Sequence, residues 1–210
     1  MVRRLLQLYV GLGLYGLSTA MFIRSDLGVD PWDVFHLGVG IQLGMTIGTV
    51  IILTGAAVLL LWIPLRQMPG LGTISNVICI GLAADASMAL IPELDSLPVR
   101  IAFLVSGIVM NAIATSMYIG AGFGPGPRDG LMTGIHARLG WSIRSVRTSI
   151  EVSVLLIGCV LGGTFGVGTV VYALTIGPLI QLCLPWFRQK PRVAEIAQPE
   201  RVVRSEEHTS

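Results

Sequence analysis

Two short motifs, 96 residues apart, hold most of the residues that could do chemistry in this chain. The sequence LGVDPWD covers residues 27–33, and FGPGPRD covers residues 123–129. They share a glycine, a proline and an aspartate at matching positions: Gly28 and Gly124, Pro31 and Pro127, Asp33 and Asp129. Carboxylate and guanidinium groups that lie between apolar stretches could bind a charged solute or close a pathway through salt bridges.

The DPWD sequence is typical of a helix start. Asp30 suits the N-cap, Pro31 the first helical position, and Asp33 the first turn, where a carboxylate favours the positive end of the helix dipole. The second motif repeats this pattern with glycine at the cap: Gly126, Pro127 and Asp129. Two interpretations stay open for Asp33 and Asp129. They either cap helices or form a pair of related carboxylates at the two mouths of a transport pathway.

Arg128 follows a turn made by Gly124, Pro125, Gly126 and Pro127. Free backbone amides at such a helix start, together with the arginine, could hold a carboxylate or a phosphate. The alternative is an ordinary arginine of a cytoplasmic loop. We interpret Trp32, at the equivalent position of the first motif, as an anchor at the membrane interface.

A second set of candidates consists of polar side chains inside apolar stretches, where ionisable groups are costly without partners: Asn76, Asp85, Asn111, Glu151 and Gln181. Glu151 lies four residues after Arg147, which predicts an ion pair on one helical face. Asp85 and Gln181 are expected to meet when the two halves of the chain are superposed. Asn76 and Asn111 are expected to form hydrogen bonds between helices.

Metal, cofactor and enzyme motifs are not found. His36 and His136 are interpreted as interfacial, and Cys79, Cys159 and Cys183 as small buried hydrophobic residues. The sequence has no metalloprotease, serine-hydrolase or paired-cysteine motif, and no pattern that suggests binding of nucleic acid. We therefore predict no enzyme activity, no cofactor and no metal site.

Composition identifies the elements that must position these residues. The chain is 53% hydrophobic and 12% charged, with a mean hydropathy of +0.77, whereas a soluble domain carries about 25% charged residues. We predict an all-α integral membrane protein with six spans of roughly 20 residues. These spans are 5–23, 47–65, 73–91, 101–119, 146–161 and 169–187. The fifth is the weakest because it contains Arg147 and Glu151.

The positive charges gather on one side of this predicted topology: Arg3, Arg4, Arg66, Arg128, Arg138, Arg144, Arg147, Arg188, Lys190 and Arg192. The other side receives only Arg24 and Arg100. Because Lys and Arg accumulate in short cytoplasmic loops, we expect both termini in the cytoplasm. Residues 1–188 form one transmembrane domain in this reading, and residues 189–210 a disordered cytoplasmic tail. The final RSEEHTS resembles a translated sequencing adapter, and we interpret it as an artefact.

The two motifs belong to a longer internal repeat. A shift of 96 positions gives 21 identities over the 71 positions from Gly11 to Gly81. With three spans in each copy (about 5–91 and 101–187), the second copy enters the membrane from the opposite side, which favours an inverted repeat. Segments 34–44 and 130–140 are too short to span and could be re-entrant or interfacial helices. If they did span, the repeats would be parallel.

Four blocks of sequence together resemble a known family: LGxDPWD, GxGPGPRDGLMTGI, SIRSVRTSIE and GGTxGVGTVVYALTIGPLIQ. Over roughly residues 3–187, the chain is similar to the YczE/YyaS/YitT-like group of bacterial integral membrane proteins. The resemblance implies a protein of the bacterial cytoplasmic membrane with several helices. It brings no catalytic or binding role with it.

Three functions stay open. The first is a small secondary transporter or permease for a small anionic or amphiphilic solute, with Asp30 and Asp33 at one gate and Arg128 and Asp129 at the other. The second is a regulatory or scaffold protein that docks a cytoplasmic protein through a basic face of Arg128, Arg138, Arg144 and Arg147. The third is the membrane substrate-binding subunit of a multi-subunit importer. Contact with the lipid bilayer is expected in each case, and a homodimer is compatible with the glycine-rich sequence.

Overall fold

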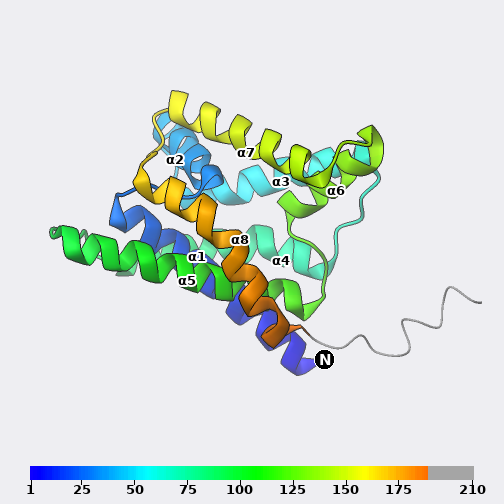
Figure 1. Cartoon of the computed structure of the whole chain (residues 1–210), viewed down its shortest axis with the longest axis horizontal. Helices are drawn as coiled ribbons and strands as arrows, with labels where there is room; N and C mark the ends of the chain where they lie inside the picture. The colour runs from blue at the N-terminus through cyan, green and yellow to red at the C-terminus, as the bar shows by residue number, and fades with distance from the viewer. Residues whose placement is uncertain (189–210) are drawn as a thin grey trace, which may run out of the picture.

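The structure, a computed structural model, describes residues 1–188 and is all-helical over that range (Figure 1). The predicted tail lies outside the described residues. The helices are α1 (Val2–Ser25), α2 (Pro31–Leu43), α3 (Ile47–Leu65), α4 (Leu71–Leu90), α5 (Leu97–Ala121), α6 (Pro127–Leu139), α7 (Ile143–Val160) and α8 (Val167–Phe187).

Five of these helices are long and apolar enough to cross a membrane: α1, α3, α4, α5 and α8. Helix α7, with 18 residues, carries Arg144, Arg147 and Glu151 and is not among them. Helices α2 and α6 have 13 residues each, which corresponds to about 20 Å at 1.5 Å per residue. The hydrocarbon core of a bilayer is about 30 Å thick, so these two helices are too short to span it.

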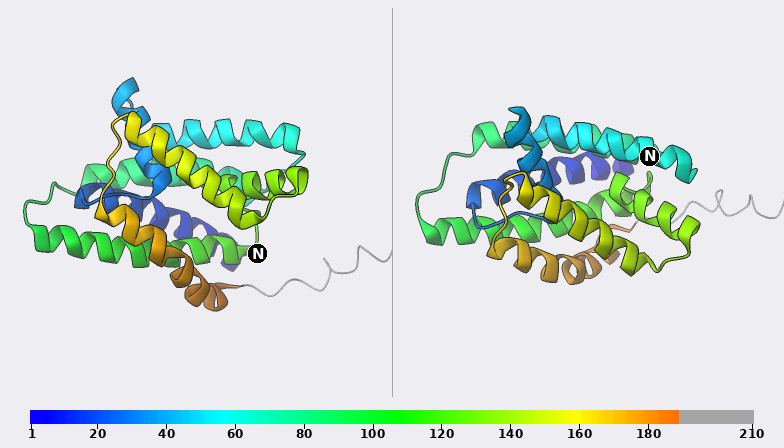
Figure 2. Two further views of the ribbon diagram at one scale, coloured as in Figure 1. Left: turned by 45° about the horizontal axis from the view of Figure 1, so that its top comes forward. Right: turned by 90° about the horizontal axis from the view of Figure 1, so that it is seen from above.

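Helices α1 and α5 lie side by side and antiparallel, with α5 along one edge of the bundle (Figures 1 and 2). Near the start of α1, Arg4 donates hydrogen bonds to the carbonyl oxygens of Ala121 and Gly122 at the end of α5. Near the start of α5, Arg100 donates in the same way to the backbone of Ser25 and Asp26 at the end of α1. Each arginine therefore satisfies carbonyl groups that a helix end leaves without partners.

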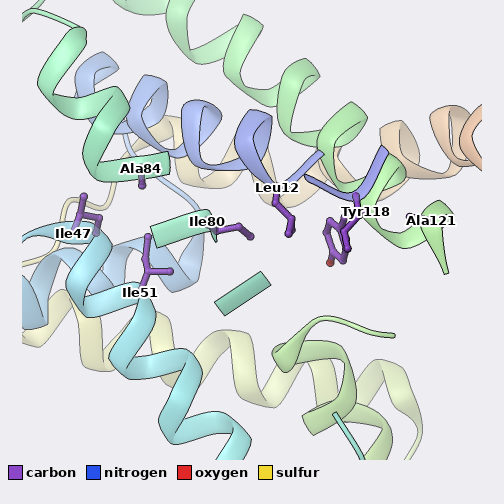
Figure 3. Close-up of a cluster of buried hydrophobic side chains, with 8 residues drawn as sticks. Leu12, Ile47, Ile51, Ile80, Ala84, Tyr118 and Ala121 are labelled. Carbon is purple, nitrogen blue, oxygen red and sulfur yellow. The ribbon is translucent and has the colours of Figure 1, made fainter. Parts of the chain in front are cut away.

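Apolar side chains fill the space between α1, α3, α4 and α5. Leu12, Ile51 and Ile80 are buried together, and Tyr118 packs on the same cluster with its ring directed inward (Figure 3). Many large apolar side chains also remain on the outside of the helices, among them Leu60 and Leu90. An apolar exterior of this extent suits contact with lipid rather than with water.

The helices of the second half begin about 96 residues after those of the first. Helices α2 and α6 begin at Pro31 and Pro127, and α3 and α7 at Ile47 and Ile143. The loop before each short helix contains a glycine with positive φ, 113° at Gly28 and 119° at Gly124, a conformation that other residues rarely adopt.

Each of these loops packs against the last helix of the other half. The amide of Gly168 at the start of α8 donates to the carbonyl oxygen of Leu27 at 2.7 Å. The amide of Gly72 at the start of α4 donates to the carbonyl oxygen of Phe123 at 2.9 Å. A side chain at Gly28 or Gly124 would collide with these helix starts. The two halves are thus joined by reciprocal contacts.

Glycines also permit the closest helix crossings. A Cβ atom at Gly48 of α3 would lie 2.1 Å from the carbonyl oxygen of Gly81 in α4, and one at Gly158 of α7 would lie 2.5 Å from the backbone nitrogen of Phe35 in α2. Small residues of this kind let membrane helices approach closely. Of the three cysteines predicted to be buried, Cys183 is buried and Cys79 is partly buried, but Cys159, next to Gly158, is exposed, so the prediction is wrong for Cys159.

Candidate functional site

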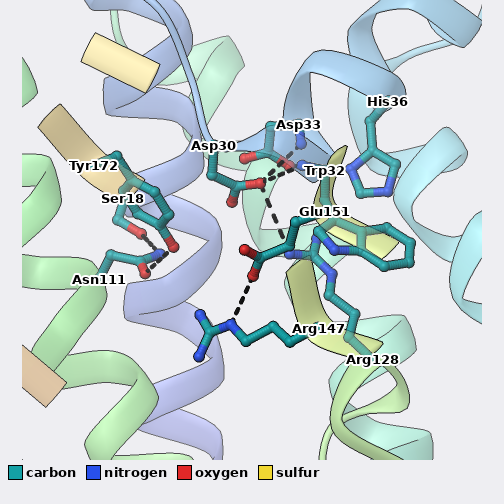
Figure 4. A network of polar contacts seen from close by, with 10 residues as sticks. All are labelled: Ser18, Asp30, Trp32, Asp33, His36, Asn111, Arg128, Arg147, Glu151 and Tyr172. Atoms are coloured by element: carbon teal, nitrogen blue, oxygen red, sulfur yellow. Dashed lines mark hydrogen bonds and ion pairs between the residues drawn. The ribbon is translucent and has the colours of Figure 1, made fainter. Parts of the chain in front are cut away.

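A cavity of about 250 Å³ lies in the middle of the bundle, and all eight helices of the described chain contribute to its lining. The charged residues of both motifs line it: Asp30, Asp33, Arg128 and Asp129. Figure 4 shows Arg128 extending from α6 towards the carboxyl groups at the start of α2. Nη1 of Arg128 lies 3.8 Å from Oδ1 of Asp30.

This convergence corrects one expectation. The motifs were assigned to two separate mouths of a pathway, but their charged side chains meet in one cavity. The reason is that both short helices start inside the bundle, at the turns after Gly28 and Gly124, and their first residues are directed towards each other. The motifs therefore form two sides of a single site.

The start of α2 has the predicted capping geometry. Oδ1 of Asp30 accepts hydrogen bonds from the amides of Trp32 and Asp33, at 2.8 and 2.9 Å, and Pro31 is the first residue of the helix. Oδ1 of Asp33 lies 3.0 Å from Nδ1 of His36. These contacts turn both carboxyl groups inward, where each side chain is only 2% exposed.

Two aromatic residues of α2 lie deeper than predicted. His36 is 2% exposed and bonded to Asp33, so its interpretation as an interfacial residue is wrong. Trp32 is 7% exposed, and its ring faces the guanidinium group of Arg128, whose central carbon is 4.6 Å from the ring centroid. Trp32 is therefore a stacking partner inside the bundle rather than an anchor at the interface.

The start of α6 has no side-chain cap, because Gly126 occupies the N-cap position. Its first-turn carboxylate, Asp129, accepts a hydrogen bond from the hydroxyl of Tyr118 on α5, at 3.3 Å. The side chain of Arg128 is 31% exposed. Its guanidinium group, held by Trp32 on one side and Asp30 on the other, is the positive group at the centre of the cavity.

Burial and charge act in opposite directions on the carboxyl groups at the start of α2, which lie outside the membrane-length helices. Burial, together with the nearby carboxyl group of Asp33, raises the pKa of Asp30 to about 6 against the opposing effect of Arg128. Burial likewise raises the pKa of Asp33 to about 6, against the effect of Arg128. One guanidinium group thus faces two closely spaced carboxyl groups that are withdrawn from water.

The predicted ion pair of α7 is present. Nε of Arg147 lies 2.8 Å from Oε1 of Glu151, and both side chains line the cavity. Asn111 forms the predicted hydrogen bonds between helices, because it donates to Ser18 of α1 at 2.9 Å and accepts from Tyr172 of α8 at 3.1 Å (Figure 4). Asn76 lies on the cavity wall.

The predicted contact between Asp85 and Gln181 is wrong. Asp85 accepts hydrogen bonds from the hydroxyl of Thr46, at 2.6 Å, and from the amide of Gly48, at 2.8 Å. It therefore satisfies the N-terminus of α3 within its own half of the chain. Gln181 is exposed on α8.

The predicted docking face does not form as one surface. Arg128 is directed into the cavity, Arg147 pairs with Glu151, and Arg138 donates to the carbonyl oxygen of Pro64. Arg144 is exposed on α7. Two of the four arginines thus line the cavity and two lie outside it, and the docking role stays a prediction.

Sequence reasoning missed three tyrosines that line the cavity: Tyr15, Tyr118 and Tyr172. A signal for two of them was available. Tyr15 is 96 positions from Asn111, and Tyr172 is 96 positions from Asn76. Each pair places a polar residue at the same position of both copies, within an otherwise apolar helix. Searching the repeat for shared polarity, rather than for shared identity, identifies these positions.

The model of a family of unknown function (DUF6198) matches residues 2–185. The chain belongs to this family. Its relatives include an uncharacterized protein of Haemophilus influenzae, 38% identical over 186 residues that make up 89% of this chain and 85% of the relative. The uncharacterized membrane protein YczE of Bacillus subtilis is 30% identical over 179 residues, 84% of this chain and 83% of YczE.

A third relative, the uncharacterized protein YyaS of Bacillus subtilis, is 25% identical over 184 residues, 85% of this chain and 92% of YyaS. These matches confirm the resemblance to YczE and YyaS. The description of YczE as a membrane protein agrees with the five membrane-length helices. No solved structure matches the chain.

Proposed function

We propose that the protein is a small secondary transporter or permease of the bacterial cytoplasmic membrane. The observation that carries the proposal is the cavity in which the starts of two short helices, one from each half of the chain, converge with their charged residues. Matching interrupted segments in two halves of a membrane protein commonly mark a transport site. The solute binds in this cavity, in contact with Arg128 and the tyrosines.

The architecture in this proposal is an inverted repeat of two three-span units. The reciprocal contacts of Arg4 and Arg100 support it, because Arg4 joins the start of α1 to the end of α5, and Arg100 joins the start of α5 to the end of α1. Helix α7 is the sixth span. It occupies the place of α3 in the second half, and its ion pair lines the cavity. Helices α2 and α6 are re-entrant, and both termini lie in the cytoplasm.

The test uses cysteine labelling, because it needs no knowledge of the solute. In a background with Cys79, Cys159 and Cys183 replaced by Ala, Thr115→Cys places a thiol on the cavity wall. A membrane-impermeant maleimide is applied to vesicles of each orientation. A transporter opens its cavity to each side in turn, so Thr115→Cys should react from both sides.

Two exposed residues provide the matched controls. Met45 and Trp141 lie 96 positions apart, in the turns before α3 and α7. In an inverted repeat, Met45→Cys and Trp141→Cys react only from opposite sides of the membrane. Reaction of both from the same side would refute the inverted architecture. If these controls behave as expected but Thr115→Cys reacts from one side or not at all, the transporter proposal fails.

A further inference from the structure

Three buried oxygen atoms beside the cavity have no hydrogen-bond partner. They are Oδ2 of Asp30, Oδ2 of Asp33 and the hydroxyl of Thr19. Thr19 lies on α1 and is fully buried. Thr19 and Asp30 lie close enough to the carboxyl group of Asp33 to lower its pKa as hydrogen-bond donors would, although none of the three unpartnered oxygens meets the geometry of a formed hydrogen bond. Buried polar atoms without partners are rare and costly, and here three of them come together from two helices.

A count of hydrogen atoms shows what this cluster lacks. Oδ1 of Asp30 is occupied by two amides, and Oδ1 of Asp33 by the ring of His36. The hydroxyl of Thr19 supplies one hydrogen for the remaining oxygens. With both carboxyl groups ionised, at least one carboxylate oxygen therefore stays without a donor. One additional proton on the pair provides the missing hydrogen bond.

The charges around the pair lead to the same result. Arg128 of α6 is the cation that faces it, at 3.8 Å from Asp30. Burial lowers the pKa of His36 to about 3, so the ring is neutral and donates from Nδ1. Tyr15 of α1 and Tyr172 of α8 line the same cavity and bring hydroxyl groups rather than positive charges. Asp129 of α6, which accepts a hydrogen bond from Tyr118, lines the same cavity and is attracted to the same guanidinium group. Two ionised carboxylates at the start of α2 would thus exceed the positive charge that faces them.

We propose that Asp30 and Asp33 share one proton and form a proton-binding site that couples transport to the proton gradient. The coupling rests on the proposed transport function, whereas the binding of the proton does not. A proton suits the pair better than a metal ion, because within residues 1–188 no group of three His, Cys, Asp or Glu side chains is placed to hold one. The second half has Gly126 in place of Asp30, so the start of α6 does not repeat this acidic pair.

The test is infrared spectroscopy of the full-length protein in detergent, which detects the carbonyl stretch of a protonated carboxyl group. We expect a signal of about one protonated group near pH 6, where the pKa values of both carboxyl groups lie. It should disappear in Asp30→Asn and also in Asp33→Asn, because the carboxylate that remains faces Arg128 without a second carboxylate beside it. Asparagine caps a helix about as well as aspartate, so Asp30→Asn should fold; at Asp33, asparagine keeps the size of the side chain and an oxygen that can accept from His36. The exposed Asp95→Asn is the control and should keep the signal.

The absence of the signal in the wild-type protein, or its persistence in both variants, would overturn the proton site. Coupling has its own readout. A pH gradient across the vesicles should change the side from which Thr115→Cys reacts, and Asp33→Asn should abolish that change. If the infrared result holds but Thr115→Cys reacts from one side only, the transport function fails and the proton site stands. If Thr115→Cys, with Asp30 and Asp33 intact, reacts from both sides and a pH gradient does not change this reaction, the coupling is refuted.

Discussion

Replacement of Arg128 by methionine removes the central positive charge and keeps an unbranched side chain over the ring of Trp32. The distance of 3.8 Å between Nη1 and Oδ1 of Asp30 corresponds to a gross attraction of about 4 kcal/mol at an effective dielectric constant of about 20. The guanidinium group is partly exposed and loses some hydration on burial, and both effects reduce the net value. We expect Arg128→Met to lower the free energy of unfolding by about 2 kcal/mol near neutral pH.

The assay is thermal unfolding in detergent as a function of pH. For a chain of this length, 2 kcal/mol corresponds to a fall in Tm of about 4–8 °C. The deficit should shrink as the pH falls, because protonation of Asp30 and Asp33 removes the negative charge that Arg128 balances. Arg144→Met, which removes an exposed arginine, should leave Tm unchanged. A deficit that is absent, or that stays constant between about pH 8 and pH 4, would refute the electrostatic reasoning.

Two further predictions concern the wild-type protein and its glycines. Because burial raises the pKa of Asp30 from 3.8 to about 6, its contribution to stability is complete below about pH 4 and is lost as the pH rises through about 6. Thermal unfolding should show this decline, and Asp30→Asn should flatten it; an equal slope in both proteins contradicts the assignment. Gly48→Ala should cost about 2–3 kcal/mol, since its Cβ would lie 2.1 Å from the carbonyl oxygen of Gly81. Gly13→Ala, with open space around the new methyl group, should raise the free energy of unfolding by up to about 1 kcal/mol. If Gly48→Ala and Gly13→Ala shifted Tm in the same direction, the close crossing of α3 and α4 at Gly48 would be contradicted.

The sequence predicted the features that depend on local chemistry. The helix starts at Pro31 and Pro127 follow from the residues that cap and begin a helix, and these need no information about distant parts of the chain. The ion pair between Arg147 and Glu151 is equally local, since both residues lie on one helical face. The length of the short helices was limited by the turn residues Gly44 and Gly140, which end them in the left-handed conformation.

Features that depend on packing between distant helices were not predictable in this way. Trp and His are residue types that suit the membrane interface, and Trp32 and His36 are buried only because α2 lies within the bundle. Superposition of the repeats suggested that Asp85 and Gln181 meet, but equivalent positions of two copies need not be neighbours. Asp85 instead accepts a hydrogen bond from the backbone amide of Gly48, at the start of α3.

Comparison of the two halves separates residues that set the backbone from residues that set the charge. Positions with the same residue in both halves, such as Gly28 and Gly124, form equivalent turns. The chemistry lies where the halves differ: Asp30 corresponds to Gly126, and Trp32 to Arg128. If both halves carried the aspartate, the cavity would hold a further buried carboxylate; if both carried the tryptophan, it would lack the guanidinium group of Arg128. Similar turns in the two halves thus bring two helix starts together, and the differences between the halves create one acidic pair and one guanidinium group in contact.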